Sequence, residues 1–300
     1  MRSLPFWSQV ILKDPINSEI WSESPAVQDR IRSHHSTHRA DVLQALIRPG
    51  LRWVPDIVGE EWRDAGSVFI VGSAYSPFIS GYAGRSRSMS LESYPRAEGA
   101  VDIFLAEFLG NVVEEDEDYY GPIRLLLEGA GLTSSQAVLT DLVRACFVRT
   151  SDLAGGDKKA VRADPDLFMA FAESGWAWTW RRLCESEAGC IVALGTVAEH
   201  GLLKLLSSEG LAVTVRGDPR GVFRRNPRPV TGYALLGRGL AFWRDRTTWW
   251  DVAGQVGGRE RRWRLLPACH PNWYHGHDPG YRRTSAVLHE MLVLGGTSGG

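Results

Sequence analysis

The sequence predicts an α/β fold, a three-layer α/β/α arrangement around a central, mostly parallel four-stranded sheet. Four short apolar runs rich in β-branched residues alternate with segments of helical periodicity. Continuous apolar strands that alternate with helices are typical of a parallel sheet covered on both faces. Each apolar run also ends in an unusual sequence, and such sheets bind ligands at the carboxyl ends of their strands.

The expected elements follow one another along most of the chain. The four strands are expected at residues 67–72, 137–143, 190–195 and 263–268. Helices are expected at residues 101–109, 122–128, 164–184, 196–206 and 284–294. Residues 1–60, rich in Trp, Pro, Ser and His, predict a helical or irregular N-terminal extension. Residues 61–300 then form one α/β domain with an Arg- and Trp-rich insertion of short strands around 212–262.

The composition bounds the class of protein. The net charge of -1 gives no general attraction to nucleic acid or membrane. No apolar run approaches the roughly 18 residues of a membrane helix, and the N-terminus lacks a signal-peptide pattern. The four cysteines form no CxxC pair, which disfavours structural zinc or an iron–sulfur cluster. We therefore expect a cytoplasmic protein with no membrane contact, no metal, no cofactor and no obligate protein partner.

Charge is distributed unevenly along the chain. Residues 114–118 are all acidic, a pattern typical of a solvated loop or helix face. Between Arg216 and Arg264 there are twelve arginines and four acidic residues. This local excess of positive charge suits a surface that contacts phosphates, and it is also compatible with an ordinary solvated face.

His270-Pro271 ends the last apolar run. A residue before proline is held in extended geometry, and proline cannot donate a hydrogen bond to a sheet. His270 is therefore expected at the exit of a strand, where it can contact a ligand. A surface histidine in a loop is the other interpretation of this stretch alone.

Taken in order, the four strand exits resemble motifs of the uracil-DNA glycosylase superfamily. Gly72-Ser73-Ala74-Tyr75 is similar to the first motif, and Pro77-Phe78 with Gly81-Tyr82-Ala83-Gly84 is similar to the segment that stacks on the base. Leu139-Thr140-Asp141-Leu142-Val143-Arg144-Ala145-Cys146 resembles the second strand motif, and residues 191–195 resemble the third. Cys269-His270-Pro271-Asn272 resembles the closing His-Pro-Ser motif. The likeness spans roughly residues 65 to 295.

This resemblance implies an enzyme that flips a base out of DNA and hydrolyses its N-glycosidic bond, leaving an abasic site. It assigns catalytic roles to His270, Asp141, Ser73 and Tyr75. It assigns base binding to Ala74, Phe78, Tyr82 and Asn272. It assigns DNA contacts to Arg85, Tyr281, Arg282 and Arg283. In this scheme His270 stabilises the negative charge of the departing base. A role in DNA repair or in defence against phage would follow.

The chain departs from the family at two positions. Ser73-Ala74 carries no carboxylate, where many members place a catalytic polar group. Glu98 and Asp102 could replace it, although acids at those positions are also ordinary for a helix N-terminus. Asp141 stands where the family commonly has Asn. An ionised Asp only accepts hydrogen bonds, so it favours a base with an amino group over uracil.

These departures favour a modified cytosine, including the glucosylated kind found in some phage DNA, as the released base. A purely structural hydrogen bond is the other interpretation of Asp141. The iron–sulfur branches of the family carry cysteines near the N-terminus, whereas this chain has none before Cys146, which places it outside those branches.

Two other functions remain open at this point. A non-catalytic nucleic-acid-binding module would explain the missing carboxylate. A metal-dependent hydrolase could use His270, His275, His277 and Asp278, or the cluster His34, His35 and His38, but neither group contains the motif HExxH. The alternating Trp176, Trp178 and Trp180 are expected to serve core or interface packing and not to form a cage for a base.

Overall fold

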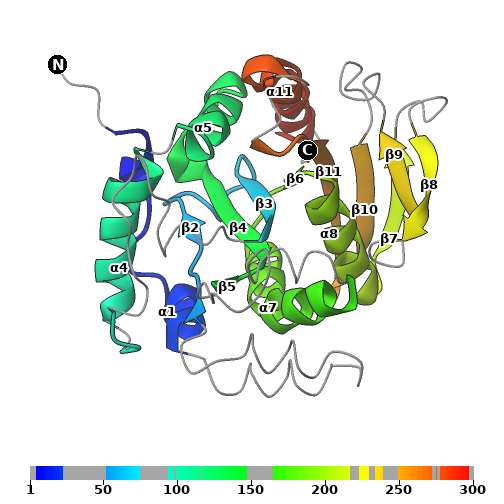
Figure 1. Ribbon diagram of the computed structural model, residues 1–300. Helices are drawn as coiled ribbons and strands as arrows, with labels where there is room; N and C mark the ends of the chain where they lie inside the picture. Colours follow the sequence, from blue (N-terminus) through cyan, green and yellow to red (C-terminus); the bar gives the residue numbers. More distant parts are fainter. Residues whose placement is uncertain are drawn as a thin grey trace.

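A mixed seven-stranded sheet forms the centre of the fold (Figure 1). The computed structural model describes residues 5–22, 52–74, 94–97, 99–115, 117–146, 165–216, 223–229, 234–238, 249–271, 275 and 278–296. Within these residues the strand order is β2-β4-β3-β6-β11-β10-β7. The strands are β2 (Ile57–Val58), β3 (Val68–Ala74), β4 (Ala137–Val143), β6 (Cys190–Leu194), β7 (Ala212–Arg216), β10 (Trp249–Val256) and β11 (Arg259–Ala268).

The four central strands, β4, β3, β6 and β11, run parallel. They are the four predicted strands, and β11 begins four residues before its predicted start at Trp263. The sheet is wider than predicted because antiparallel strands extend it at both edges: β2 pairs with β4, and β10 pairs with both β11 and β7. The prediction of four strands is corrected to seven for this reason.

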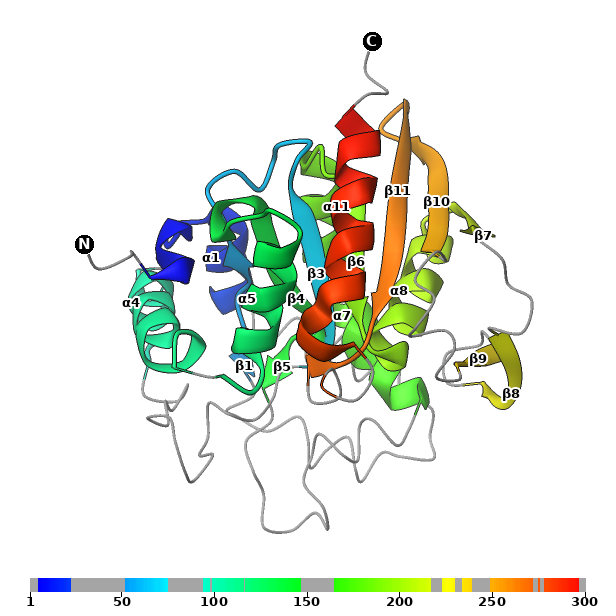
Figure 2. The same cartoon turned by 90° about the horizontal axis from the view of Figure 1, so that it is seen from above.

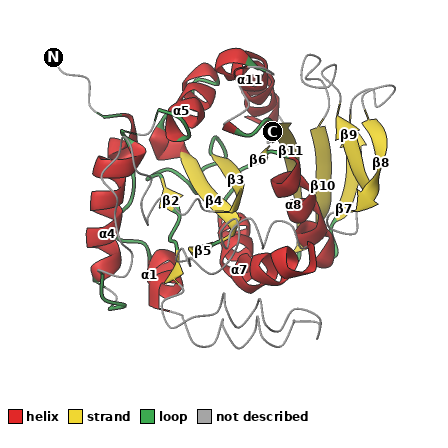
Figure 3. Ribbon diagram, viewed as in Figure 1, coloured by secondary structure: helices red, strands yellow, loops and turns green. Residues whose placement is uncertain are grey.

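Alternate residues of the central strands face two separate cores. In β3, Val68 and Ile70 belong to one apolar cluster, and Phe69 and Val71 belong to the other. The first core is covered by α4 (Ala100–Phe108), α5 (Tyr120–Gly129) and α11 (Arg282–Gly296), the second by α7 (Pro165–Glu185) and α8 (Thr196–Ser208). Figure 3 shows the sheet between α5 and α11 on one side and α7 and α8 on the other. The expected helices are all present, and no described helix is long and apolar enough to cross a membrane.

The described part of the N-terminal segment packs into this domain. It contains a 3-10 helix (Phe6–Gln9), α1 (Pro15–Ser22), β1 (Arg52–Trp53) and the edge strand β2. Trp7 and Trp21 join one core, whereas Ile16, Ile20 and Trp53 join the other. β1 pairs with β5 (Ala145–Cys146) in a separate two-stranded sheet. Residues 52–58 therefore run antiparallel to β5 and β4, from Arg52 opposite Cys146 to Val58 opposite Val138.

A buried ionic network ties the N-terminal segment to the sheet. Asp56 lies between Arg144, which follows β4, and Arg182 of α7, and it forms an ion pair with each. Arg182 also binds Asp14 and Asn17 before and within α1. Burial alone would raise the pKa of the Asp56 carboxyl, but the two guanidinium groups hold it below its ordinary value. Arg144, part of the second family-like motif, is thus a structural residue.

The Arg- and Trp-rich region contributes to the sheet and to a separate hairpin. β7 and β10 extend the main sheet, whereas β8 (Phe223–Pro229) and β9 (Ala234–Arg238) form a sheet of their own. Arg261 contacts Glu187 and lies over the ring of Trp263, so this arginine serves intramolecular packing. Trp176 and Trp178 are buried in the second core, which confirms the expectation for the tryptophan alternation of α7.

Candidate active site at the carboxyl edge of the sheet

The exits of the four parallel strands meet at one edge of the sheet. In Figure 2 the central strands run downward, and α11 begins at the edge where they end. Gly72 of β3 is in register with Asp141 of β4. The backbone N–H of Gly195, just after β6, donates to the carbonyl of Ala268 at the end of β11, at 2.8 Å. The topology therefore brings together the strand exits that the sequence singled out.

Gly72 and Asp141 are in close contact. A Cβ atom added to Gly72 would overlap Oδ1 of Asp141 and would lie 2.9 Å from its Cγ and 3.0 Å from the hydroxyl of Tyr119. Only glycine leaves room for the carboxylate over the backbone of β3. Asp141 is 5% exposed. The glycine of the first motif thus positions the acid of the second.

Gly195 makes the turn from β6 into α8. Its φ of 86° and ψ of 162° lie in a region that is essentially restricted to glycine. A Cβ atom there would lie 3.5 Å from the Cβ of His270. This turn therefore places the N-terminus of α8 beside His270, which is half-buried at the end of β11.

Tyr119 connects the two halves of the site, and sequence reasoning missed it. Its ring centroid lies 5.8 Å from that of His270, with the planes inclined by 57°. With Gly72 and Asp141 it lines a small cavity of about 10 Å³. A useful indication was available, because a helix that leads into a parallel strand begins at the carboxyl edge of the sheet, and Tyr119 directly precedes α5.

The cavity beside Asp141 has room for about one water molecule. This volume is the space left between the described side chains, and residues 75–93, which follow β3, lie outside them.

Ser73 and Ala74 form the end of β3. Ser73 is buried, and Ala74 pairs with Val143 of β4. Asp102 lies in the first turn of α4, where a carboxylate stabilises the helix N-terminus. This position supports the helix-terminal interpretation of Asp102, whereas Glu98 lies outside the described residues.

The loop after His270 is held by Tyr281 and Asp278. The Tyr281 side chain is fully buried, and its hydroxyl donates to the carbonyl of Cys269 at 2.6 Å. The expected contact of this side chain with DNA is therefore corrected to an anchoring role beside His270. Tyr281 has a φ of 51°, unusual for a bulky residue, which indicates that its burial outweighs local backbone strain.

Asp278 caps the start of α11. Its carboxylate accepts hydrogen bonds from the backbone N–H groups of Arg283 and Thr284 and from the Thr284 hydroxyl. Both oxygens are thus engaged in the fold, which weakens the metal-site interpretation. Among the residues that the structure describes, no group of three or more His, Cys, Asp or Glu could hold a metal ion.

Arg282 and Arg283 are exposed in the first turn of α11. Cations are unfavourable at a helix N-terminus because of the helix dipole, whereas phosphate is favoured there. Two arginines at this position therefore suit an anionic ligand better than they suit helix stability.

Several predicted site residues lie outside the described part of the chain. They are Tyr75, Phe78, Tyr82, Arg85 and Asn272. No protein-family model matches the chain, and a comparison with curated proteins gives no significant match.

Proposed function

We propose that this protein is a DNA glycosylase that releases a modified cytosine. The observation that carries the proposal is the convergence of Asp141 and His270, with Tyr119 beside both, at the carboxyl edge of the parallel sheet. One group suits recognition of the base, and the other suits stabilisation of the leaving group. Asp141 lies within β4, and strands hold functional groups more precisely than loops do, whereas His270 lies two residues after the end of β11.

The arrangement of the strands supports the same proposal. The four family-like motifs lie at the ends of β3, β4, β6 and β11, which are the four parallel strands of a sheet covered on both faces. The resemblance to the uracil-DNA glycosylase superfamily predicted four parallel strands, and these four form the centre of the wider, mixed seven-stranded sheet. Ligands of such sheets bind at this edge.

In the proposed reaction, the bond between C1′ of the sugar and the base nitrogen breaks, and the bonding electrons leave with the base. His270 donates a hydrogen bond to the base carbonyl oxygen and so stabilises the developing negative charge. Water adds to the cationic sugar carbon and loses a proton to solvent, and the free base is protonated. The carboxylate-free Ser73-Ala74 segment makes leaving-group stabilisation the larger contribution.

Asp141 gives the proposal its specificity. An ionised carboxylate accepts hydrogen bonds and donates none, so it attracts the exocyclic amino group of a cytosine and repels the O4 of uracil. Arg282 and Arg283 at the start of α11 would contact phosphates next to the flipped nucleotide. Movement of the Tyr119 side chain, which lines the small cavity beside Asp141, would enlarge it for a base.

A nucleic-acid-binding module without catalysis is the second candidate. The burial of Ser73 and the lack of a carboxylate in Ser73-Ala74 favour it, because these residues supply no group to activate water. Such a module would retain the arginine pair and Asp141 but would release no base.

Release of free bases separates these two functions. Duplex DNA containing uracil, hypoxanthine, 5-hydroxymethylcytosine or its glucosylated form is incubated with the protein in the presence of a chelator. Free bases are then measured by mass spectrometry, and abasic sites are detected by cleavage in alkali. We expect release of a modified cytosine, reduced by roughly 100-fold or more in His270→Ala, because a lost charge-stabilising donor costs about that much. Asp64→Asn, an exposed change before β3 at the opposite edge, is the control. Tight binding with no released base would favour the binding module.

A further inference from the structure

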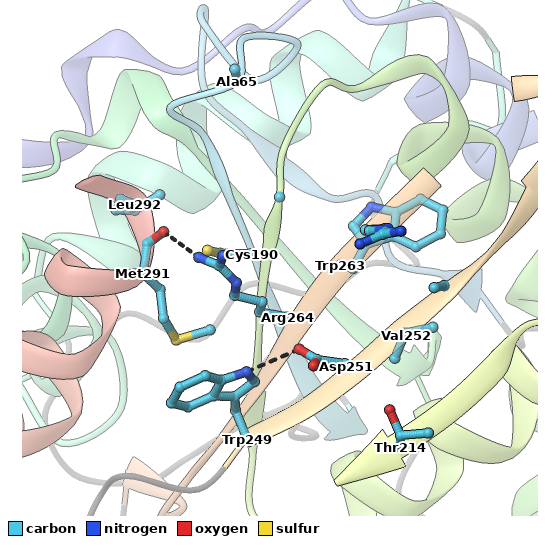
Figure 4. A pocket seen from close by; sticks show the side chains of 13 residues that line it. Ala65, Cys190, Thr214, Trp249, Asp251, Val252, Trp263, Arg264, Met291 and Leu292 are labelled. Carbon is cyan, nitrogen blue, oxygen red and sulfur yellow. Dashed lines mark hydrogen bonds between the residues drawn. The ribbon is translucent and has the colours of Figure 1, made fainter. Parts of the chain in front are cut away.

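A larger cavity lies on a different part of the sheet (Figure 4). It has a volume of about 610 Å³ and is lined by residues of β6, β7, β10, β11 and α11. Ligand pockets for small molecules measure about 300–1,000 Å³. Cys190, the first residue of β6, lines this cavity, whereas Gly195 follows the other end of the same strand. The cavity is therefore separate from the candidate active site.

Trp249 forms an aromatic wall of this cavity. Its indole N–H donates to Oδ1 of Asp251 at 3.0 Å, and the bond fixes the orientation of the ring (Figure 4). The side chain is half-buried and packs against the core beneath α11. A tryptophan that is held in place and lines a cavity offers a ready stacking surface, because little side-chain freedom is lost when a flat ligand binds.

Arg264 provides a fixed cation in the same cavity. One N–H of its guanidinium donates to the carbonyl of Met291 in α11 at 2.9 Å (Figure 4). A guanidinium has five N–H donors in a planar fork that suits phosphate and carboxylate, so one bond to the helix orients the group without exhausting it. Arg262, which is exposed and two residues earlier in β11, lines the cavity as well, and it forms an ion pair with Glu260, which is not part of the lining.

The charges of the lining residues favour an anion. The charged residues in the lining are Arg262, Arg264 and Asp251, which leaves one net positive charge. Asp251 is engaged with Trp249, and it lies opposite Arg264 in the β10–β11 pairing. A flat aromatic ring with an attached anionic group satisfies the stacking surface and the cationic wall at the same time.

We propose that this cavity binds a nucleotide, with its base stacked on Trp249 and its phosphate held by Arg264 and Arg262. The nucleotide is either free or one unit of a single strand, because both present the same base and phosphate. Stacking of one base on an aromatic side chain contributes about 1–3 kcal/mol. The inference does not depend on base release at the other edge of the sheet.

Calorimetric titration with thymidine monophosphate tests this site, and a ten-residue oligothymidylate forms a second arm. Thymidine and inorganic phosphate are the partial ligands. We expect saturable binding of the monophosphate, weakened by about ten-fold or more in both Trp249→Leu and Arg264→Gln. Arg259→Gln is the matched control, because Arg259 is exposed at the far end of β11 and does not line the cavity.

The results of these titrations distinguish a free nucleotide from a single strand as the ligand, and some of them would refute the proposed binding site. Tighter binding of the oligonucleotide supports a single strand as the ligand, and binding of the monophosphate alone supports a free nucleotide. If inorganic phosphate binds as well as the monophosphate, if neither nucleotide probe binds, or if Trp249→Leu binds unchanged, the proposal is wrong. Trp249→Leu decides the matter if Arg264→Gln fails to fold. None of these results bears on base release.

Discussion

Replacing Gly72 with Ala tests the contact on which the candidate active site is built. The added methyl carbon would overlap Oδ1 of Asp141 and lie 2.9 Å from its Cγ, whereas ordinary contacts begin at 3.4 Å. Cγ must therefore retreat by about 0.5 Å, and the overlapping oxygen must retreat further. A misplacement of about 1 Å can cost roughly 100-fold in rate, so we expect base release to fall by about 10- to 100-fold.

The same change should lower the free energy of unfolding by about 1–3 kcal/mol, the usual cost of overpacking. Base release is measured by mass spectrometry, and stability is measured by urea unfolding. Gly110→Ala is the matched control, because a Cβ atom there meets nothing within 4 Å. If Gly72→Ala unfolds and releases base as Gly110→Ala does, Asp141 does not lie over β3 as described.

Three further changes test the fold around the site. Tyr281→Phe removes the hydrogen bond to Cys269, so it should cost about 1 kcal/mol of stability and lower base release while DNA binding is retained; unchanged release would exclude an anchoring role. Asp56→Asn leaves two buried arginines undercompensated and should cost about 3–5 kcal/mol in urea unfolding; a loss below 1 kcal/mol would contradict the network. Burial lowers the pKa of His200 to about 4 from its ordinary 6.5. The unfolded chain therefore binds a proton first, and this contribution to stability is present above pH 6.5 and lost as the pH falls toward 4. The free energy of unfolding should fall by about 2 kcal/mol between pH 7 and pH 5 because of His200, and His200→Phe should abolish that part of the pH dependence. If the variant shows the same difference in stability between the two pH values as the wild type, His200 is not buried as a neutral group.

The central strands could be predicted because burial on both faces leaves an uninterrupted apolar run in the sequence. Residues 137–143 form such a run, and β4 has the predicted bounds. The outer strands have a weaker hydrophobic pattern in the sequence. β2 is only two residues long, Ile57–Val58, and β10 is partly exposed along much of its length. Their pairing depends on neighbours that are distant in sequence, which local periodicity does not reveal.

The candidate site was predicted in part for a similar reason. Gly72 and Asp141 lie in the carboxyl-terminal halves of β3 and β4, and Gly195 and His270 lie just after β6 and β11, so the parallel topology places all four towards one edge of the sheet. Topology also places the start of α5 at this edge, but the contact between the rings of Tyr119 and His270 depends on how that helix packs.

For Tyr281, the sequence predicted an exposed position, whereas the side chain is buried. A Tyr-Arg-Arg sequence suggested three surface residues, but the tyrosine is buried by a backbone conformation that the sequence does not signal.

The most direct test of the central claim compares the bases released by the wild-type protein and by Asp141→Asn. Asparagine both donates and accepts, so it can recognise uracil, whereas aspartate accepts only. We predict that the wild-type protein releases a modified cytosine and that Asp141→Asn shifts the ratio of released bases toward uracil. Release of uracil by the wild-type protein, with a ratio that Asp141→Asn leaves unchanged, would contradict this prediction.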